Sequence, residues 1–269
     1  MAVTIKDIAK KAGVSYSTVS RALNNDKIIK QETRERIARI AREMGYKPNA
    51  IARGLVMKET NTLGLVIPDI TNPFYPEVAR GIEECANEYG YTIFLCNSNW
   101  DSVKENKYID ILQSKRVDGI IVAPVSQELD IIRKTYAASM PVVFVGKKIE
   151  FSNSSYVVID NRKGGFIATE YLLNKGYTRI AFIGGLEKDS TNHDRLMGYQ
   201  DALKINNIPV DPSIIKQGSF KRESGYASMI SLLEQGNEIQ AVFAGNDVIA
   251  FGVILKERCN SSSLLRLFR

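Results

Sequence analysis

The first 45 residues carry apolar side chains at the spacing of three short amphipathic helices. The predicted inner faces are formed by Ile8, Ala9 and Ala12, by Val19, Ala22 and Leu23, and by Ile37, Ile40, Ala41 and Met44. Gly13 separates the first two helices, and Ser15 is a suitable N-cap for the second. Gly45 suits the left-handed conformation that ends many helices. Residues 4–45 are therefore predicted to form a small all-α domain.

From residue 62 onward, short apolar runs alternate with longer amphipathic segments. The predicted strands are 63–67, 92–95, 119–122, 142–145, 157–159, 180–183, 214–216 and 241–244. The predicted helices are 74–89, 101–116, 161–175, 194–206, 223–235 and 247–257. Buried strands that alternate with helices are typical of parallel sheets covered on both faces. The fold class expected for this part is therefore doubly wound α/β.

The positive charge of the chain is concentrated at its N-terminal end. Residues 1–60 contain 13 Lys and Arg against 6 Asp and Glu, whereas the rest of the chain contains 23 against 24. A small basic module suits a polyanion, because phosphate neutralisation supplies most non-specific nucleic-acid affinity. A basic solubilising tail is the alternative, but it would lack the apolar periodicity seen here. No apolar run is long enough for a membrane span or a secretion signal, so a cytoplasmic protein without membrane contact is expected.

Side chains suited to catalysis or metal binding are sparse. Cys85, Cys96 and Cys259 form no CxxC pair, which fits a reducing cytoplasm, and the first two are expected to be buried. His193 is the single histidine and has no metal-ligand spacing around it. The sequence contains no G-x-S-x-G, P-loop or dinucleotide-binding glycine motif. We therefore expect no catalytic residue, no metal and no cofactor, and a protein that is not an enzyme.

Two helices joined by a tight glycine-containing turn are typical of a helix-turn-helix, whose second helix enters the DNA major groove. The second predicted helix exposes hydroxyl and guanidinium groups that can address base edges and phosphates. Arg21 in particular could bind guanine through both O6 and N7. An ordinary solvated helix face can carry the same residue types, and that alternative remains open from composition alone.

The segment from Thr4 to Asn24, TIKDIAKKAGVSYSTVSRALN, closely resembles the signature of the LacI/GalR (lactose-repressor) family of bacterial transcription regulators. The GYKPN and ARGL elements within residues 45–55 resemble the family's hinge helix. The resemblance implies a homodimeric repressor on near-palindromic double-stranded operator DNA. Leu55 would be the apolar wedge in the minor groove, with a plain core leucine as the alternative. The implied DNA-binding residues are Thr4, Ser15, Tyr16, Ser17, Thr18, Arg21, Asn24, Asn49, Arg53 and Leu55.

The resemblance extends to about residue 257 and implies a body similar to periplasmic sugar-binding proteins, with two doubly wound subdomains around an effector cleft. Ligands of open α/β sheets also bind beyond the carboxyl ends of strands, on general grounds. A sugar is the expected effector, although no acidic–basic pair lies near Ser126 as it often does in sugar-binding relatives. Asn72 and Asp160 also suit helix caps. The expected effector-binding residues are Asn72, Phe74, Tyr75, Asp160, Arg195, Phe220, Asn246 and Asp247.

The predicted organisation has five parts. They are a helix-turn-helix domain (1–46), a hinge helix and linker (47–60), an N-subdomain (61–161), an incomplete C-subdomain (162–258) and an atypical tail (259–269). Family members continue beyond this point with further strands, so a truncated or frameshifted product, impaired as a regulator, is expected. A naturally short variant is the alternative. Two other functional classes are alternatives. A sugar-binding receptor would need a signal peptide, and a carbohydrate-active enzyme would need a set of catalytic residues.

Overall fold

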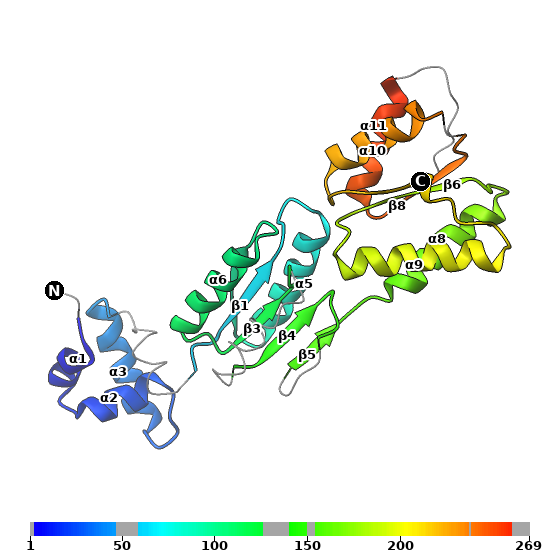
Figure 1. Cartoon of the computed structure of the whole chain (residues 1–269). Helices are drawn as coiled ribbons and strands as arrows, with labels where there is room; N and C mark the ends of the chain where they lie inside the picture. Colours follow the sequence, from blue (N-terminus) through cyan, green and yellow to red (C-terminus); the bar gives the residue numbers. More distant parts are fainter. Residues whose placement is uncertain (1–2, 47–58, 126–139, 150–153, 237, 260–269) are drawn as a thin grey trace. The chain divides into compact units, whose positions relative to one another are not determined.

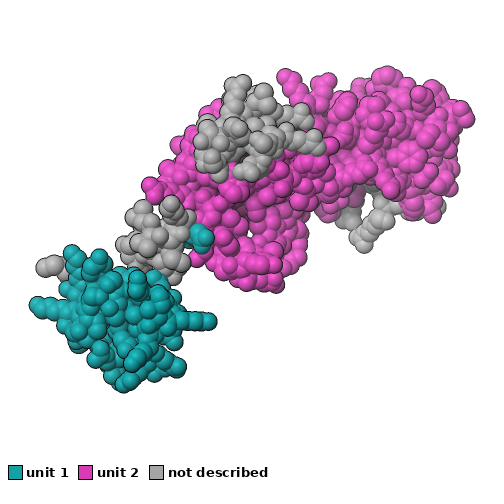
Figure 2. Space-filling model, turned by 90° about the horizontal axis from the view of Figure 1, so that it is seen from below, with its two compact units in different colours: residues 1–60 teal, residues 61–269 magenta. Residues whose placement is uncertain are grey.

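The computed structural model in Figure 1 describes residues 3–46, 59–125, 140–149, 154–236 and 238–259, with the backbone alone for residues 255–259. The chain divides into two compact units, residues 1–60 and 61–269, which Figure 2 shows in teal and magenta. The first unit is helical, and the second contains two parallel β-sheets. Each unit is described below by itself.

Three helices form the first unit: α1 (Ile5–Ala12), α2 (Tyr16–Leu23) and α3 (Gln31–Glu43). Thr4 and Asp7 form a reciprocal capping box at the start of α1, which satisfies backbone donors that the helix cannot pair internally. Gly13 ends α1 at a φ of 65°, a left-handed conformation that glycine adopts without a steric penalty. Ser15 caps α2 through the amide of Thr18. Local sequence thus determines where the first two helices meet.

The core of the first unit joins all three helices. Ile8, Val19 and Ile37 contribute one fully buried side chain each, from α1, α2 and α3 respectively. Alanines fill the remaining core positions, namely Ala9, Ala12, Ala22 and Ala41. Small side chains at these positions let the helices approach closely, so the three helices form one rigid body around a compact apolar centre.

The second unit begins with an all-parallel sheet of five strands in the order β2-β1-β3-β4-β5. The strands are β1 (Thr62–Ile67), β2 (Thr92–Asn97), β3 (Gly119–Val122), β4 (Val142–Val145) and β5 (Ser154–Val157). Helix α5 (Phe74–Glu88) packs against β2, and α6 (Ser102–Ser114) packs against β1. We call this sheet with its two helices the N-lobe.

A second parallel sheet has the order β7-β6-β8, with β6 (Ile180–Gly184), β7 (Ile215–Gln217) and β8 (Ala241–Ala244). Its helices are α8 (Asn161–Asn174), α9 (Ser190–Ile205), α10 (Arg222–Glu234) and α11 (Asp247–Cys259), and a 3-10 turn, η1 (Pro212–Ile214), precedes β7. Figure 1 shows α8 and α9 on one side of these strands and α10 and α11 on the other. We call this part the C-lobe.

Alternation along β6 explains why helices cover both faces of the C-lobe sheet. Ile180 and Phe182 belong to the cluster that contains Tyr199 of α9, whereas Ala181 and Ile183 belong to the cluster that contains Met229 of α10. Successive side chains of a strand point to opposite faces, so a continuous apolar run must be covered twice. The doubly wound α/β prediction is confirmed for this chain.

Two glycines bring α8 and α9 unusually close together. A Cβ at Gly165 would collide with the carbonyl oxygen of Arg195, and a Cβ at Gly198 would collide with that of Arg162. Backbone therefore contacts backbone at this crossing, and no larger residue fits at either position. The close approach fixes where α9 carries Arg195.

Two expectations differ from the structure. Cys85 is exposed on α5 and Cys96 is only half-buried on β2, so the expectation that both are buried is wrong. Small size and low polarity allow burial but do not require it, and the helix period places Cys85 on the outer face of α5. The strand expected at residues 157–159 lies earlier, at β5, because the pairing with β4 ends at Val157.

Glu105 on α6 is a fully buried carboxyl group in the N-lobe. Its Oε2 accepts a hydrogen bond of 2.9 Å from the amide of Val125, and Oε1 has no partner among the described residues. Burial raises the pKa of Glu105 from 4.5 to about 7, while the Val125 amide and the nearby Lys147 ammonium oppose this shift. The protonated form is therefore the one that the fold favours.

We expect Glu105→Gln to stabilise the protein at pH 8 and to change its stability little at pH 5. A carboxyl whose pKa is raised by folding stabilises the fold below its unfolded pKa, and this contribution is lost as the pH rises through about 7. The gain at pH 8 is limited to about 3 kcal/mol, at about 1.4 kcal/mol per pKa unit. Urea unfolding at both pH values measures it. Glu88→Gln, at an exposed carboxylate, is the control, and an equal effect of Glu105→Gln at both pH values contradicts the prediction.

Candidate functional site

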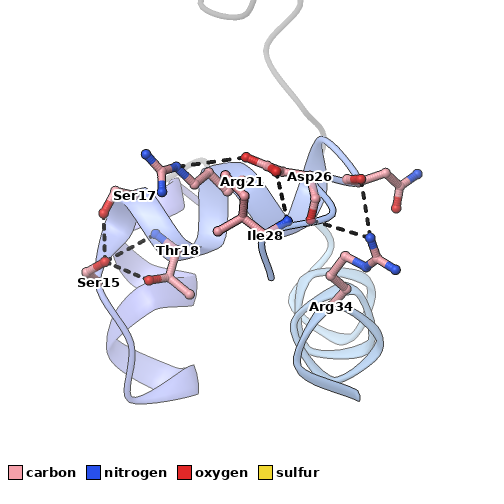
Figure 3. A network of polar contacts seen from close by, with 8 residues as sticks. Ser15, Ser17, Thr18, Arg21, Asp26, Ile28 and Arg34 are labelled. Atoms are coloured by element: carbon pink, nitrogen blue, oxygen red, sulfur yellow. Dashed lines mark hydrogen bonds and ion pairs between the residues drawn. The ribbon is translucent and has the colours of Figure 1, made fainter. Parts of the chain in front are cut away.

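The N-terminal end of α2 is held by a cluster of hydroxyl groups, shown in Figure 3. Ser15 Oγ accepts the amide of Thr18 at 3.1 Å and lies 2.7 Å from Ser17 Oγ and 2.8 Å from Thr18 Oγ1. These contacts restrict the rotamers of all three side chains. Tyr16, beside them, is 67% exposed, so a large ring with a polar end projects from the first turn of the helix. This end of α2 is therefore ordered and accessible at once.

The other end of α2 carries a cation beside a structured loop (Figure 3). Arg21 Nε lies 4.0 Å from Asp26 Oδ2, and Asp26 Oδ1 accepts the amide of Ile28. Arg34 of α3 donates to the carbonyl oxygens of Asn25 and Asp26. The Arg21 side chain is 58% exposed, and an exposed ion pair of this length stabilises little. Arg21 can exchange its carboxylate partner for a phosphate or a guanine at low cost.

The predicted DNA-binding residues fall into three groups. Thr4 and Ser15 are exposed, but their hydroxyls already cap α1 and α2. The exposed residues of α2 and its C-cap are Tyr16, Ser17, Arg21 and Asn24, and Thr18 is half-buried. The hinge predictions Asn49, Arg53 and Leu55 lie outside the described residues. Ile28, which is 74% exposed in the loop after α2, was not singled out from the sequence, because a lone apolar residue in a loop has no periodicity.

In the second unit, polar and aromatic residues gather at the carboxyl ends of the strands. After β1, Asn72 Oδ1 accepts the amide of Phe74, which fixes the turn into α5. The rings of Phe74 and Tyr75 then meet edge to face at 5.2 Å. Burial raises the pKa of Tyr75, and the charge of Asp189 acts in the same direction. Phe74 remains 44% exposed, so part of this side chain is accessible from solvent.

Arg195 lies on α9 and places a cation near the carboxyl ends of the C-lobe strands. Its Nε donates to Asn161 Oδ1 at 2.9 Å, and its Nη1 donates to the carbonyl oxygen of Gly245. Burial lowers the pKa of Arg195, and the charges of Asp189 and Asp247 oppose this effect. A guanidinium stays charged in proteins, so Arg195 presents fixed donors at this edge.

Four of the predicted effector residues line one cavity of about 720 Å³ in the C-lobe; they are Asp160, Arg195, Asn246 and Asp247. Two of them also cap helices, because Asp160 accepts the amide of Lys163 and Asn246 accepts the amide of Ile249. Asp160 therefore serves as a helix cap, as the alternative from the sequence suggested, and Asn72 likewise stabilises a local turn. The role of the eight residues in effector binding stays a prediction.

Sequence reasoning missed three residues at the same strand ends. Trp100 follows β2, and its ring stacks on Phe220 with centroids 5.4 Å apart and an interplanar angle of 23°. Lys147 follows β4, and its Nζ lies 3.2 Å from Asp189 Oδ2. Lys147 Nζ also donates to the carbonyl oxygen of Val125. The rule about carboxyl ends of strands, applied to every strand, would have found all three.

The part of the chain that the structure describes contains neither a membrane-spanning helix nor a metal-binding cluster. No helix there is long and apolar enough to cross a membrane. Nor do the residues searched include three or more His, Cys, Asp or Glu side chains placed to hold a metal ion.

Two family models match the chain. The model described as bacterial regulatory proteins, lacI family, matches residues 4–49. The model described as periplasmic binding proteins and sugar binding domain of LacI family matches residues 60–262. Among similar curated proteins, the transcriptional regulator RegA of Clostridium saccharobutylicum is 38% identical over 97% of this chain and 79% of its own length. Catabolite control protein A of Priestia megaterium is 38% identical over 94% of this chain and 77% of its own length.

Solved structures agree with these matches. The transcriptional regulator CelR in complex with cellobiose has a TM-score of 0.70 and 28% identity, covering 98% of this chain and 80% of its own. The lac repressor dimer bound to operator and an anti-inducer has a TM-score of 0.83 at 23% identity, covering 96% and 78%, and so supports the fold alone. The relatives matched are HTH-type transcriptional regulators rather than enzymes.

We expect Arg21→Ala to weaken specific DNA binding by about 1–3 kcal/mol and to relax sequence preference at one base pair, because a bidentate arginine–guanine contact would be lost. A shift assay on operator and random DNA at several salt concentrations measures both effects.

Arg39→Ala is the matched control, since Arg39 is an exposed arginine on α3. Removal of this charge should not change sequence preference. Equal loss of affinity for operator and random DNA in Arg21→Ala would assign Arg21 to a phosphate and contradict the base-reading role.

Proposed function

This chain belongs to the lacI family of bacterial regulatory proteins and is a DNA-binding transcription regulator controlled by an effector. We propose that it acts as a homodimeric repressor on a near-palindromic operator and that its effector is a sugar. The observation that carries the proposal is the pairing of two distinct surfaces in one chain. One is the capped, exposed face of α2, and the other is the cluster of polar and aromatic residues at the strand ends of the second unit.

The DNA half of the proposal assigns α2 to the major groove. Tyr16, Ser17 and Arg21 would address bases or phosphates, with Thr18 and Asn24 at the margins of the contact. The rigid core beneath α2 supports this role, because a reading helix must present its side chains without reorganising. A homodimer places two such helices on two half-sites, which requires an operator with approximate two-fold symmetry. Such a regulator acts in the cytoplasm, where bacterial DNA is accessible, and needs no catalytic residue.

The effector half assigns the strand-end residues to a sugar. Arg195 and Asp247 offer a charged donor and a charged acceptor, and both line the same cavity. Phe74 offers a partly exposed ring for stacking. Pairs of hydroxyls bind well to carboxylate and guanidinium groups, and aromatic rings suit the apolar face of a sugar ring. The cellobiose complex of the relative CelR supports the same class of ligand.

A nucleobase is the second candidate effector. The Tyr75, Trp100 and Phe220 rings lie in succession at 6.3 and 5.4 Å, and flat aromatic faces of this kind also accept planar heterocycles. A ligand panel must therefore contain both classes.

We expect Arg195→Ala to weaken effector binding by about 10- to 100-fold, because a hydrogen bond to a charged group contributes about 1.5–3 kcal/mol. Effector-free operator binding should remain, since the α2 face belongs to the other compact unit. Calorimetry with a panel of sugars and nucleobases measures the first quantity, and an operator shift assay with each ligand measures the second.

Arg179→Ala is the control, because Arg179 forms an ion pair with Asp211 in the same lobe but does not line the cavity with Arg195. This variant should keep the effector response. If no sugar or nucleobase binds the wild-type chain, the proposed effector class is wrong.

A further inference from the structure

Among the described residues, a ring stack and an ion pair join the N-lobe to the C-lobe across the strand ends. The first is the stack between Trp100 of the N-lobe and Phe220 of the C-lobe. The second is the ion pair between Lys147 of the N-lobe and Asp189 of the C-lobe. Of the four residues in these contacts, only Phe220 is among the effector-binding residues expected from the sequence. Both contacts are intramolecular.

The loop after β2 holds Trp100 in place for its contact. The Trp100 amide donates to the carbonyl oxygen of Pro68 at 3.1 Å, which ties this loop to the end of β1. Asn99 and Trp100 both have left-handed backbone, with φ values of 57° and 61°. Asparagine tolerates this conformation, but a tryptophan rarely adopts it, so the surrounding contacts must hold it there. The indole packs against the C-lobe core cluster that contains Phe220.

The ion pair is almost completely buried. The side chains of Lys147 and Asp189 are 7% and 5% exposed, and Lys147 Nζ also donates to the Val125 carbonyl oxygen at 3.0 Å. Asp189 Oδ1 meanwhile accepts the amides of Thr191 and Asn192 at the start of α9. Each charge thus has partners within its own lobe, which limits the desolvation cost of the pair. Separation of the lobes would break the Lys147–Asp189 ion pair but leave these hydrogen bonds to Val125, Thr191 and Asn192 in place.

The two contacts lie well apart along the carboxyl-terminal edge of the N-lobe sheet. Trp100 follows β2 and Lys147 follows β4, and β1 and β3 lie between these strands. Three interstrand spacings correspond to about 14 Å. A single contact leaves the lobes free to pivot about it, whereas two contacts this far apart resist both opening and twisting.

We propose that the Trp100–Phe220 stack and the Lys147–Asp189 ion pair form a two-point latch that holds the two lobes together. In this state the indole occupies the ring face of Phe220. This consequence rests on the proposed effector site: a ligand that stacks on Phe220 must first displace Trp100. Trp100 would then select for ligands that replace its stacking contact, and the latch would set the threshold for effector action.

The latch can be tested without an effector, because Trp100 is the only tryptophan of the chain. The variants are Lys147→Met, Asp189→Ser and the two combined, in the full-length chain; serine retains the N-cap of α9 while removing its charge. Acrylamide quenching and the emission maximum report the exposure of the indole. Loss of the ion pair should raise the open fraction about tenfold, equivalent to about 1.4 kcal/mol, with stronger quenching and emission at longer wavelength. Circular dichroism establishes that each variant is folded.

Asp211→Ser is the matched control, since Asp211 caps η1 and pairs with Arg179 within the C-lobe alone. It should leave Trp100 emission unchanged. The double variant distinguishes loss of the latch from destabilisation by a single unpaired buried charge. If the ion pair is part of a latch, Trp100 remains exposed when both charges are removed. Recovery of the wild-type Trp100 emission in the double variant would overturn the proposal. Unchanged quenching in both folded single variants would overturn it too. Neither result depends on an effector, so failure of the latch and failure of the sugar assignment are distinguishable.

Discussion

Parallel strand pairing is the constraint on which the second unit depends. Every strand of both sheets runs in the same direction as its neighbours, so all carboxyl ends of a sheet meet at one edge. Residues far apart in sequence therefore gather there, including Tyr75, Trp100 and Lys147 from one lobe and Asp189 and Arg195 from the other. The ring of Tyr75 meets that of Trp100, and Lys147 pairs with Asp189, because each follows a strand or opens the helix after it.

The first unit solves a different problem, because its exposed helix must be rigid without a large core. Hydroxyl caps from Thr4 and Ser15 and one large, fully buried side chain from each helix, packed among alanines, achieve this. The same polar groups that order the start of α2 lie beside Tyr16, which projects outward. Order and accessibility at one helix end are the properties that reading a DNA groove requires.

Periodicity and capping chemistry made the helices and the parallel sheets predictable from sequence, and the long match from Thr4 to Asn24 indicated the family. Arg195 and Asp247 are predicted effector residues because resemblance and the strand-end rule agree on them, and their role stays a prediction. Trp100, Lys147 and Asp189 were missed because their significance lies in partners 42 to 120 residues away. Burial of Cys85 failed as a prediction because residue type alone does not fix the side of a helix.

The central claim is that operator and effector bind one protein at coupled sites. Its most direct test is the affinity of an effector for the free protein and for the operator-bound protein, measured by calorimetry. Linkage requires that the ratio of these affinities equal the ratio by which the effector changes operator affinity. We predict equal ratios of about 5- to 150-fold, a coupling of about 1–3 kcal/mol. Effector affinity that is the same with and without operator would contradict the claim.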